Sequence, residues 1–441
     1  EKTRRSRQQQ QQQQEESTTT LVENELSRRQ RKKQKLRELK TNIRPGYSEV
    51  LEAKKIWEKA RQKSLDPSQR VKSLAKLEEV MMGRIETFVV KHDGSRMVQT
   101  LLKYGDATQR TRVATELLPT VVVLAKSHYG KFLVQKMIKY GDEKTRHAIS
   151  EAFKPNMVSL IAHKQACSVV QYLYDELSTA TQRQNLLAKC YGNEFALFRD
   201  SDMSFTQFMD KELAPQLNNL LTPIDQQSSE PIPDADPVPL SLVVKKRSSK
   251  SAERALSWLR QFIERLTNKG SPIVELDVYH KLVCDYLTYA NHTDRVDMLS
   301  SLRETFVHML HTLEGAVIAT QGVCYGSAKD RKVIVRQMHG YQMRIASEEY
   351  GHIPVCACLH FIDDTVLLNK YVIRPLLKQI DEVLQDRYAV LVFLQVLEAT
   401  PNPRYLSPIA IQMFEKMRYH FNVKDDINDF MIFIDSTTDS T

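Results

Sequence analysis

The sequence predicts an all-α protein in which helical repeats of about 36 residues stack into a solenoid. The small residues Gly94, Gly130 and Ala166 are 36 residues apart. The same interval separates three glutamines, each five residues after one of these small residues: Gln99, Gln135 and Gln171. A fixed period of this length is typical of helical solenoids, because each unit buries its apolar face against its neighbours.

The second repeat shows how one unit divides into a buried and an exposed face. Lys131 and Gln135 are four residues apart and therefore share one helix face, with Phe132 beside them. Stacked repeats would align such clusters along one surface. The apolar residues follow the spacing of a buried helix stripe at Leu133, Val134, Met137 and Ile138.

Residues 1–45 form a basic, glutamine-rich extension. We expect residues 1–20, with seven consecutive glutamines, to be disordered or a frayed helix. The basic run at 27–40 is consistent with a nuclear-import signal, an anchor for RNA phosphates, or both. The predicted anchor residues are Arg28, Arg29, Arg31, Lys32, Lys33 and Lys35.

The predicted N-terminal arm covers residues 46–221. Helical patterns at Leu51–Ala60 and Arg70–Val90 lead into the first repeat. After Asp175 the period weakens, which predicts an irregular joint between about 176 and 252.

A linker is predicted at 222–252, where five prolines accompany several Ser and Asp residues. The C-terminal arm follows at 253–422, and residues 423–441 form an acidic tail. In this arm the period returns with spacings of 36, 36 and 38 residues, at Tyr279, Gly315, Gly351 and Ala389. The solenoid is therefore expected to continue through both arms.

The exposed positions of the C-terminal repeats differ from those of the N-terminal ones. Apolar residues replace many polar ones, so this arm is not predicted to recognise bases and could bind nucleic-acid backbone or another protein. The clusters are His280/Lys281/Cys284, Ala316/Val317/Thr320, His352/Ile353/Cys356 and Val390/Leu391/Leu394.

Charge is distributed unevenly along the chain. The net charge of +9 divides into +7 for residues 1–45, +6 for 46–221 and −4 for the remainder. A basic surface favours binding of phosphate backbones, because binding releases counterions. The alternative is a basic tail that is solvated and nonspecific.

Composition excludes several classes of protein. No stretch approaches the ~20 apolar residues of a membrane span, and no signal peptide is present. The six cysteines form no disulfide framework, which fits a reducing compartment. Because the chain starts at Glu1, we expect it to be part of a longer protein. No Gly-rich phosphate loop or Gly-x-Ser-x-Gly motif is present, so an enzyme is not predicted.

Two groups of residues could be mistaken for chemical sites. His352, Cys356 and His360 share one helix face, but eight helical residues span about 12 Å, too far for both histidines to bind one ion. Burial between repeats is the preferred interpretation, and neither a metal nor a cofactor is predicted. Asp363 and Asp364 are interpreted as a helix end followed by an N-cap.

The exposed clusters resemble those of the Pumilio (PUF) RNA-binding repeat, in which two side chains contact a base edge and a third stacks between bases. We call them the recognition clusters. The first is complete, the second has Lys at an edge position, and the third has Ser where a stacking side chain is expected. They are Ser95/Arg96/Gln99, Lys131/Phe132/Gln135 and Cys167/Ser168/Gln171.

Several short blocks resemble the Puf-A branch of this family, the divergent nucleolar Pumilio-like proteins. The resemblance covers residues 45–422 and implies an L-shaped solenoid of eleven repeats in two arms. It also implies binding of RNA or DNA with little sequence preference. The blocks are His92–Arg96, Tyr191–Phe195, Lys329–Val335 and Phe361–Thr365.

The resemblance predicts a non-enzymatic RNA-binding protein of the nucleus and nucleolus that acts in large-subunit ribosome assembly and pre-rRNA processing. Expected partners are pre-ribosomal and other structured RNA, double-stranded nucleic acid, and pre-60S proteins and assembly factors, with the chain a monomer within a larger particle. A sequence-specific mRNA repressor and a protein-interaction scaffold are the alternatives. The predicted RNA-binding residues are Lys91, His92, Ser95, Arg96, Gln99, Lys126, His128, Tyr129, Lys131, Phe132, Gln135, Lys164, Ser168 and Gln171.

Overall fold

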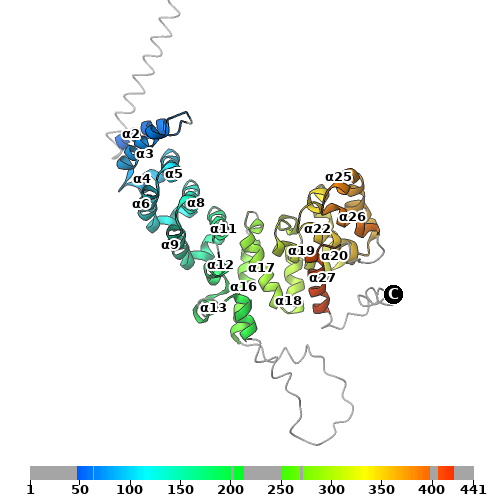
Figure 1. Ribbon diagram of the computed structural model, residues 1–441. Helices are drawn as coiled ribbons and strands as arrows, with labels where there is room; N and C mark the ends of the chain where they lie inside the picture. The colour runs from blue at the N-terminus through cyan, green and yellow to red at the C-terminus, as the bar shows by residue number, and fades with distance from the viewer. Residues whose placement is uncertain are drawn as a thin grey trace, which may run out of the picture. The chain divides into compact units, whose positions relative to one another are not determined.

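The described part of the chain is helical and contains no β-strand, which confirms the predicted all-α class (Figure 1). The extension at 1–45, most of the predicted linker and the acidic tail lie outside the described residues. The computed structural model describes residues 47–62, 64–177, 179–199, 203–212, 250–268, 272–397 and 406–421.

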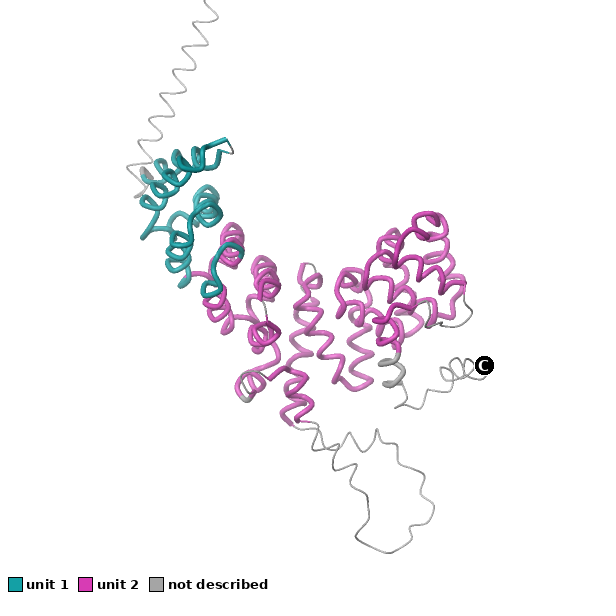
Figure 2. Tube along the Cα trace, in the orientation of Figure 1, with its two compact units in different colours: residues 1–119, 139–145 teal, residues 120–138, 146–441 magenta. Residues whose placement is uncertain are grey.

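Contacts divide the chain into two compact units (Figure 2). Unit 1 comprises residues 1–119 and 139–145, and unit 2 comprises 120–138 and 146–441. The helices of unit 1 are α2 (Tyr47–Ala60), α3 (Pro67–Met81), α4 (Ile85–Val89), α5 (His92–Tyr104) and α6 (Ala107–Leu117). The division between the units cuts a 3-10 turn (Leu118–Thr120), α8 (Gly130–Tyr140) and α9 (Glu143–Phe153).

Unit 2 contains the remaining helices. Before residue 250, residues 205–212 are helical, and the other helices there are α7 (Val121–Lys126), α10 (Met157–Ile161), α11 (Cys167–Glu176), α12 (Ala180–Leu187) and α13 (Asn193–Phe198), with 3-10 turns at Lys154–Asn156 and Ala188–Tyr191. Those from residue 250 to 346 are α16 (Lys250–Thr267), α17 (Asp277–Tyr289), α18 (His292–Leu302), α19 (Leu313–Tyr325), α20 (Ala328–Gln337) and α21 (Gln342–Ala346), with 3-10 turns at Ile273–Glu275 and Phe306–His308. The last are α22 (His352–Phe361), α23 (Thr365–Leu368), a π-helical turn (Asn369–Ile373), α24 (Arg374–Leu377), α25 (Ile380–Gln385), α26 (Ala389–Leu397) and α27 (Pro408–Phe421).

One helix begins near each predicted repeat position, and we call these seven the repeat helices: α5, α8, α11, α17, α19, α22 and α26. Within unit 2 they pack in succession, α11 on α17, α17 on α19, α19 on α22 and α22 on α26. Because α11 contacts α17 directly, the irregular stretch between them does not interrupt the stack. The prediction that the solenoid continues past the joint is therefore confirmed within unit 2.

Close backbone approach explains the glycines at four positions of the 36-residue period. A Cβ atom on Gly94 would lie 2.0 Å from the carbonyl oxygen of Phe88, which is far inside van der Waals contact. Each glycine at this position faces a carbonyl six residues earlier, at the end of a short preceding helix. The corresponding distances are 2.5 Å for Gly130 and Leu124, 2.0 Å for Gly315 and Met309, and 2.5 Å for Gly351 and Ile345. The period therefore marks where each repeat helix begins against its predecessor.

An arginine links consecutive repeats, and we call this contact the Arg–Tyr staple. Arg295 donates to the carbonyls of Leu287 and Ala290 at the end of α17, and its guanidinium carbon lies 5.5 Å from the Tyr325 ring centroid on α19. The side chain thus satisfies carbonyls left open by one repeat helix and covers a ring on the next. The same arrangement occurs in unit 1 for Arg70 with Gln62, Leu65 and Tyr104, and for Arg110 with Lys103 and Tyr140.

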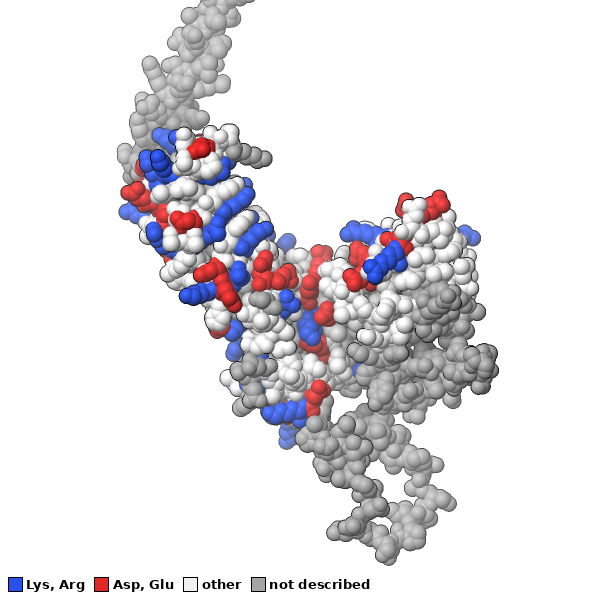
Figure 3. Space-filling view, viewed as in Figure 1, with Lys and Arg blue, Asp and Glu red and all other residues white. Residues whose placement is uncertain are grey.

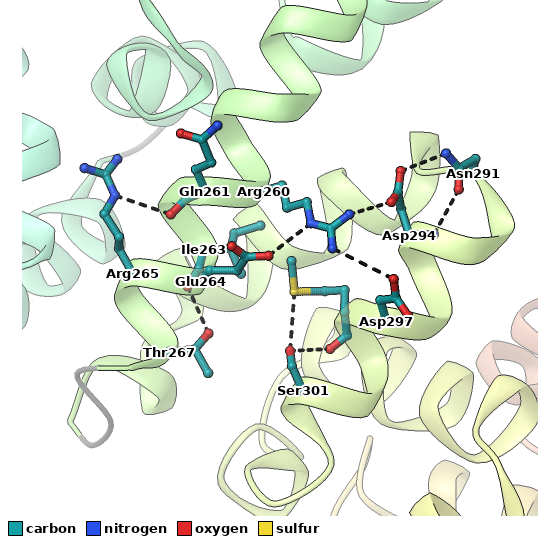
Figure 4. A network of polar contacts seen from close by, with 11 residues as sticks. Arg260, Gln261, Ile263, Glu264, Arg265, Thr267, Asn291, Asp294, Asp297 and Ser301 are labelled. Carbon is teal, nitrogen blue, oxygen red and sulfur yellow. Dashed lines mark hydrogen bonds and ion pairs between the residues drawn. The ribbon is translucent and has the colours of Figure 1, made fainter.

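A polar network joins α16 to α18 (Figure 4). Arg260 on α16 lies 3.0 Å from Glu264 on its own helix and forms ion pairs with Asp294 and Asp297 on α18. This cation is held by carboxylates and therefore serves helix packing.

Two predicted boundaries need correction. The helical pattern at Arg70–Val90 is broken, because Gly83 has a φ of +76° and turns the chain between α3 and α4. Glu116 fixes this turn by accepting hydrogen bonds from the backbone N–H groups of Gly83 and Ile85, at 2.9 and 2.8 Å. The last three residues assigned to the linker, 250–252, belong to α16.

The expected N-cap is confirmed at Asp364, which precedes α23 and accepts a hydrogen bond from the Leu367 N–H at 2.8 Å. None of the described helices combines the length and apolar character needed to span a membrane.

Candidate nucleic-acid interface

The first recognition cluster lies on α5 in unit 1, and its members differ in accessibility. Arg96 is exposed, whereas Ser95 is only 1% exposed. The Gln99 amide donates to the Ser95 hydroxyl at 3.1 Å. Ser95 is thus buried one residue after the tightly packed Gly94, and its contact with RNA stays a prediction. Arg96 is the accessible side chain of this cluster.

The second recognition cluster, on α8, presents an aromatic ring and a cation together. Phe132 is 46% exposed, and the Lys131 ammonium lies 4.9 Å from its ring centroid. Gln135 is half-buried, and its amide makes a long contact of 3.5 Å with the Ser168 carbonyl oxygen. The geometry suits a base stacked on Phe132 beside a phosphate at Lys131.

The third recognition cluster, on α11, is engaged within the protein. Cys167 is fully buried, and the Ser168 hydroxyl donates to the Gln165 carbonyl at 3.1 Å. The Gln171 amide nitrogen donates to Asp175 at 2.8 Å, and its oxygen accepts from the Val278 N–H at 3.2 Å. Gln171 thereby helps to join α11 to α17, which gives it a structural role that competes with RNA contact.

The remaining predicted residues flank these clusters. Lys91, His92 and Lys164 are exposed. His92 lies 3.3 Å from Asp93, which also pairs with Lys54, and these two partners, Lys54 foremost, lower the pKa of the Asp93 carboxyl.

The flanking residues of unit 2 form local contacts. Lys126 lies 3.3 Å from the Ser159 hydroxyl. His128 meets the exposed Tyr129 edge to face with ring centroids 5.0 Å apart. On the face drawn in Figure 3, Lys and Arg side chains are frequent over unit 1.

Several of the corresponding positions in the C-terminal repeats are buried. Ala316, Thr320, Ile353 and Cys356 are fully buried, in agreement with the prediction that this arm does not recognise bases by this pattern. Lys281 is also unsuited to phosphate binding, because its ammonium lies 2.6 Å from Asp285.

One group of metal-binding side chain types lies close together in unit 2. Asp277, His280 and His311 have potential ligand atoms within 4.8 Å of one another. However, the two ring nitrogens of His280 contact the Thr312 hydroxyl at 2.7 Å and the Val274 carbonyl at 2.8 Å. Burial, the main cause, lowers the pKa of His280 to about 4. Hydrogen bonding within the repeat therefore accounts for this histidine.

A second group of exposed cations in unit 1 was not predicted from the sequence. Lys103 and Lys139 are exposed at the ends of α5 and α8, next to Tyr104 and Tyr140. The signal that could have identified them is the sequence Lys-Tyr-Gly-Asp, which occurs at 103–106 and again, 36 residues later, at 139–142.

Comparisons with known proteins agree with the repeat structure. The family described as "Pumilio-family RNA binding repeat" matches residues 94–118, 121–152 and 156–189. Pumilio homolog 3 of Danio rerio is 32% identical over 400 residues, which cover 90% of this chain and 58% of the relative. Pumilio homology domain family member 6 of Saccharomyces cerevisiae is 30% identical, over 87% of this chain and 53% of the relative.

Solved structures of Pumilio-type proteins are also similar to this chain. The crystal structure of human Puf-A has a TM-score of 0.70 and 27% identity, and the likeness covers 84% of this chain and 65% of that one. Human Puf-A in complex with DNA has a TM-score of 0.69 and 28% identity, with coverage of 85% and 66%. The chain spans slightly more than half the length of its Pumilio relatives. The buried small residues, the stacked repeat helices and these similarities show that the chain belongs to the Puf-A branch of the Pumilio family of RNA-binding repeat proteins.

Proposed function

We propose that this chain is a non-enzymatic nucleic-acid-binding solenoid of low sequence specificity that acts in large-subunit ribosome assembly and pre-rRNA processing in the nucleolus. Its ligand is structured pre-ribosomal RNA, and double-stranded nucleic acid is a second ligand. In this role it works as a monomer within a pre-60S particle, alongside ribosomal proteins and assembly factors.

The proposed low sequence specificity rests on which residues of the recognition clusters are accessible. Ser95 and Cys167, which would contact base edges, are buried, while Arg96, Lys131 and Phe132 remain accessible. Edge contacts distinguish bases, whereas a cation binds any phosphate and an aromatic ring stacks on any base. A surface on which the second kind of contact predominates favours affinity without a sequence code.

Charge supports the same proposal. The first 221 residues carry a net charge of +13, and the remainder carries −4. Neutralisation of phosphates by such a surface releases counterions, so binding should weaken steeply with salt. The structure of human Puf-A with DNA supports extending the ligand class to DNA. The ribosomal and nucleolar parts of the proposal rest on the family resemblance.

The test is binding of the complete 441-residue chain to several unrelated RNAs and one DNA duplex across a salt series. Similar affinities that fall steeply with salt are expected. If one RNA is bound far more tightly than the others, with a shallow salt slope, the result favours a sequence-specific mRNA regulator. If no nucleic acid is bound, the result favours a protein-interaction scaffold. Co-sedimentation with pre-60S particles and nucleolar location of a fluorescent fusion test the cellular part.

A further inference from the structure

The repeated Lys-Tyr-Gly-Asp sequence ends two repeat helices with the same side chain arrangement, and both copies lie in unit 1. Tyr104 is 42% exposed. The Lys103 ammonium lies 4.8 Å from the centroid of its ring, and the guanidinium carbon of Arg70 lies 5.3 Å from it. Two cations thus share one partly exposed tyrosine.

The second copy repeats this geometry. The guanidinium carbon of Arg110 lies 5.8 Å from the Tyr140 centroid, and the Lys139 ammonium lies 6.0 Å from it. The two copies are also close to each other, because Arg110 contacts the Lys103 carbonyl oxygen at 3.5 Å and lies beside the Tyr140 ring. The pKa of Lys103 is raised, chiefly by its hydrogen bond with Tyr104. Four cations therefore gather around two phenol rings in one unit.

Nearby carboxylates do not neutralise the two lysines. Asp106 accepts a hydrogen bond from the Gln109 N–H at 2.8 Å, and Asp142 accepts one from the Thr145 N–H at 2.8 Å. Both carboxylates thus cap the helices that follow. Among the described residues, neither Lys103 nor Lys139 takes part in an ion pair with a carboxylate.

The fold requires the arginines and tyrosines but does not require the lysines. The Arg–Tyr staple occurs also in unit 2, where Tyr325 pairs with Arg295. The residue before Tyr325 is Cys324, which is buried, so a staple forms without a lysine at that position. The third repeat has Asp175 and Glu176 at the positions of Lys103 and Tyr104. The exposed lysines are therefore specific to two consecutive repeats and call for a role outside packing.

We propose that Lys103 and Lys139, held beside the stapled tyrosines, form a contact line for nucleic-acid phosphates at the C-terminal ends of α5 and α8. This line is separate from the recognition clusters and rests on the proposed function, which it extends by naming where the backbone binds. Lys103 lies on the same face of α5 as the first recognition cluster, because Arg96, Gln99 and Lys103 follow one another at intervals of three and four residues. One strand can therefore contact Arg96 and Lys103 along the same helix.

The experiment compares the complete chain with two double variants that remove equal charge. K103Q/K139Q removes the proposed line, and K72Q/K76Q removes two exposed lysines of α3 in the same unit. Binding of a labelled single-stranded RNA is measured by fluorescence anisotropy from low to high salt. Each phosphate contact contributes about 0.7 to the slope of log K against log salt. K103Q/K139Q should therefore lower the slope by about 1.4, K72Q/K76Q should leave it near the wild-type value, and K103R/K139R should restore it.

The outcomes separate the two proposals. A wild-type chain that binds no RNA overturns the proposed function and this line with it. A wild-type chain that binds with a steep slope, while K103Q/K139Q behaves like wild type or like K72Q/K76Q, overturns the line alone. Far-UV circular dichroism and the urea midpoint of each variant show whether the solenoid is intact, and K103R/K139R separates a loss of charge from a loss of packing.

Discussion

Replacing Arg295 by alanine removes one Arg–Tyr staple and should destabilise unit 2 strongly. The side chain is 9% exposed, and it donates to the carbonyls of Leu287 and Ala290 at 3.0 and 3.2 Å. Hydrogen bonds to a charged group contribute about 1.5 kcal/mol or more each, and the contact with the Tyr325 ring adds about 0.5–2 kcal/mol. The expected loss is about 3–5 kcal/mol, well above that of a typical substitution.

The assay is equilibrium urea unfolding of the complete chain, followed by far-UV circular dichroism. Arg254→Ala is the matched control, because Arg254 is 68% exposed and forms a surface ion pair with Glu194. Such a pair contributes at most about 1 kcal/mol. Arg295→Lys should recover only part of the loss, since one ammonium cannot match the guanidinium that spans two carbonyls and a ring. Equal midpoints for Arg295→Ala and Arg254→Ala would refute the staple.

Three further perturbations follow from the same structure. Gly94→Ala should lower stability by at least about 2 kcal/mol in urea unfolding, because its Cβ would lie 2.0 Å from the Phe88 oxygen and the backbone would have to move; an unchanged midpoint contradicts this. Phe132→Ala should weaken RNA binding by about 1–3 kcal/mol in anisotropy titrations, the value of one stacked base, with the urea midpoint little changed because the ring is 46% exposed. The pKa of His280 is lowered to about 4 in the folded protein, so the unfolded chain takes up the proton first and stability should fall as pH drops from 6.5 towards 4. Urea midpoints at pH 7 and pH 5 check this, and His280→Gln should flatten the difference.

The recognition clusters show how far sequence reasoning could define the candidate site. It placed the clusters on repeat helices, and it identified Arg96 and Phe132, which the structure leaves accessible. It could not foresee that Ser95 is buried, because that depends on how closely the chain around Gly94 packs. Nor could it foresee the contact from Gln171 to Val278, since the two residues are 107 positions apart.

Sequence by itself determined the helical class and the repeat positions, including those after the irregular joint. The reason is physical and local: a helix stripe has a fixed period, and a carbonyl six residues earlier leaves room for only the smallest side chain at each glycine. The turn at Gly83 escaped this reasoning, because Glu116 from another helix stabilises it.

Only the tertiary structure decided which polar side chains remain available to a ligand. Arg260 and Lys103 are both cations on helices, yet Asp294 of the neighbouring helix α18 neutralises the first while the second is exposed beside Tyr104. Helical periodicity assigns a residue to a face, but its partners come from neighbouring helices. The availability of a charge therefore depends on packing between repeats, which local spacing does not encode.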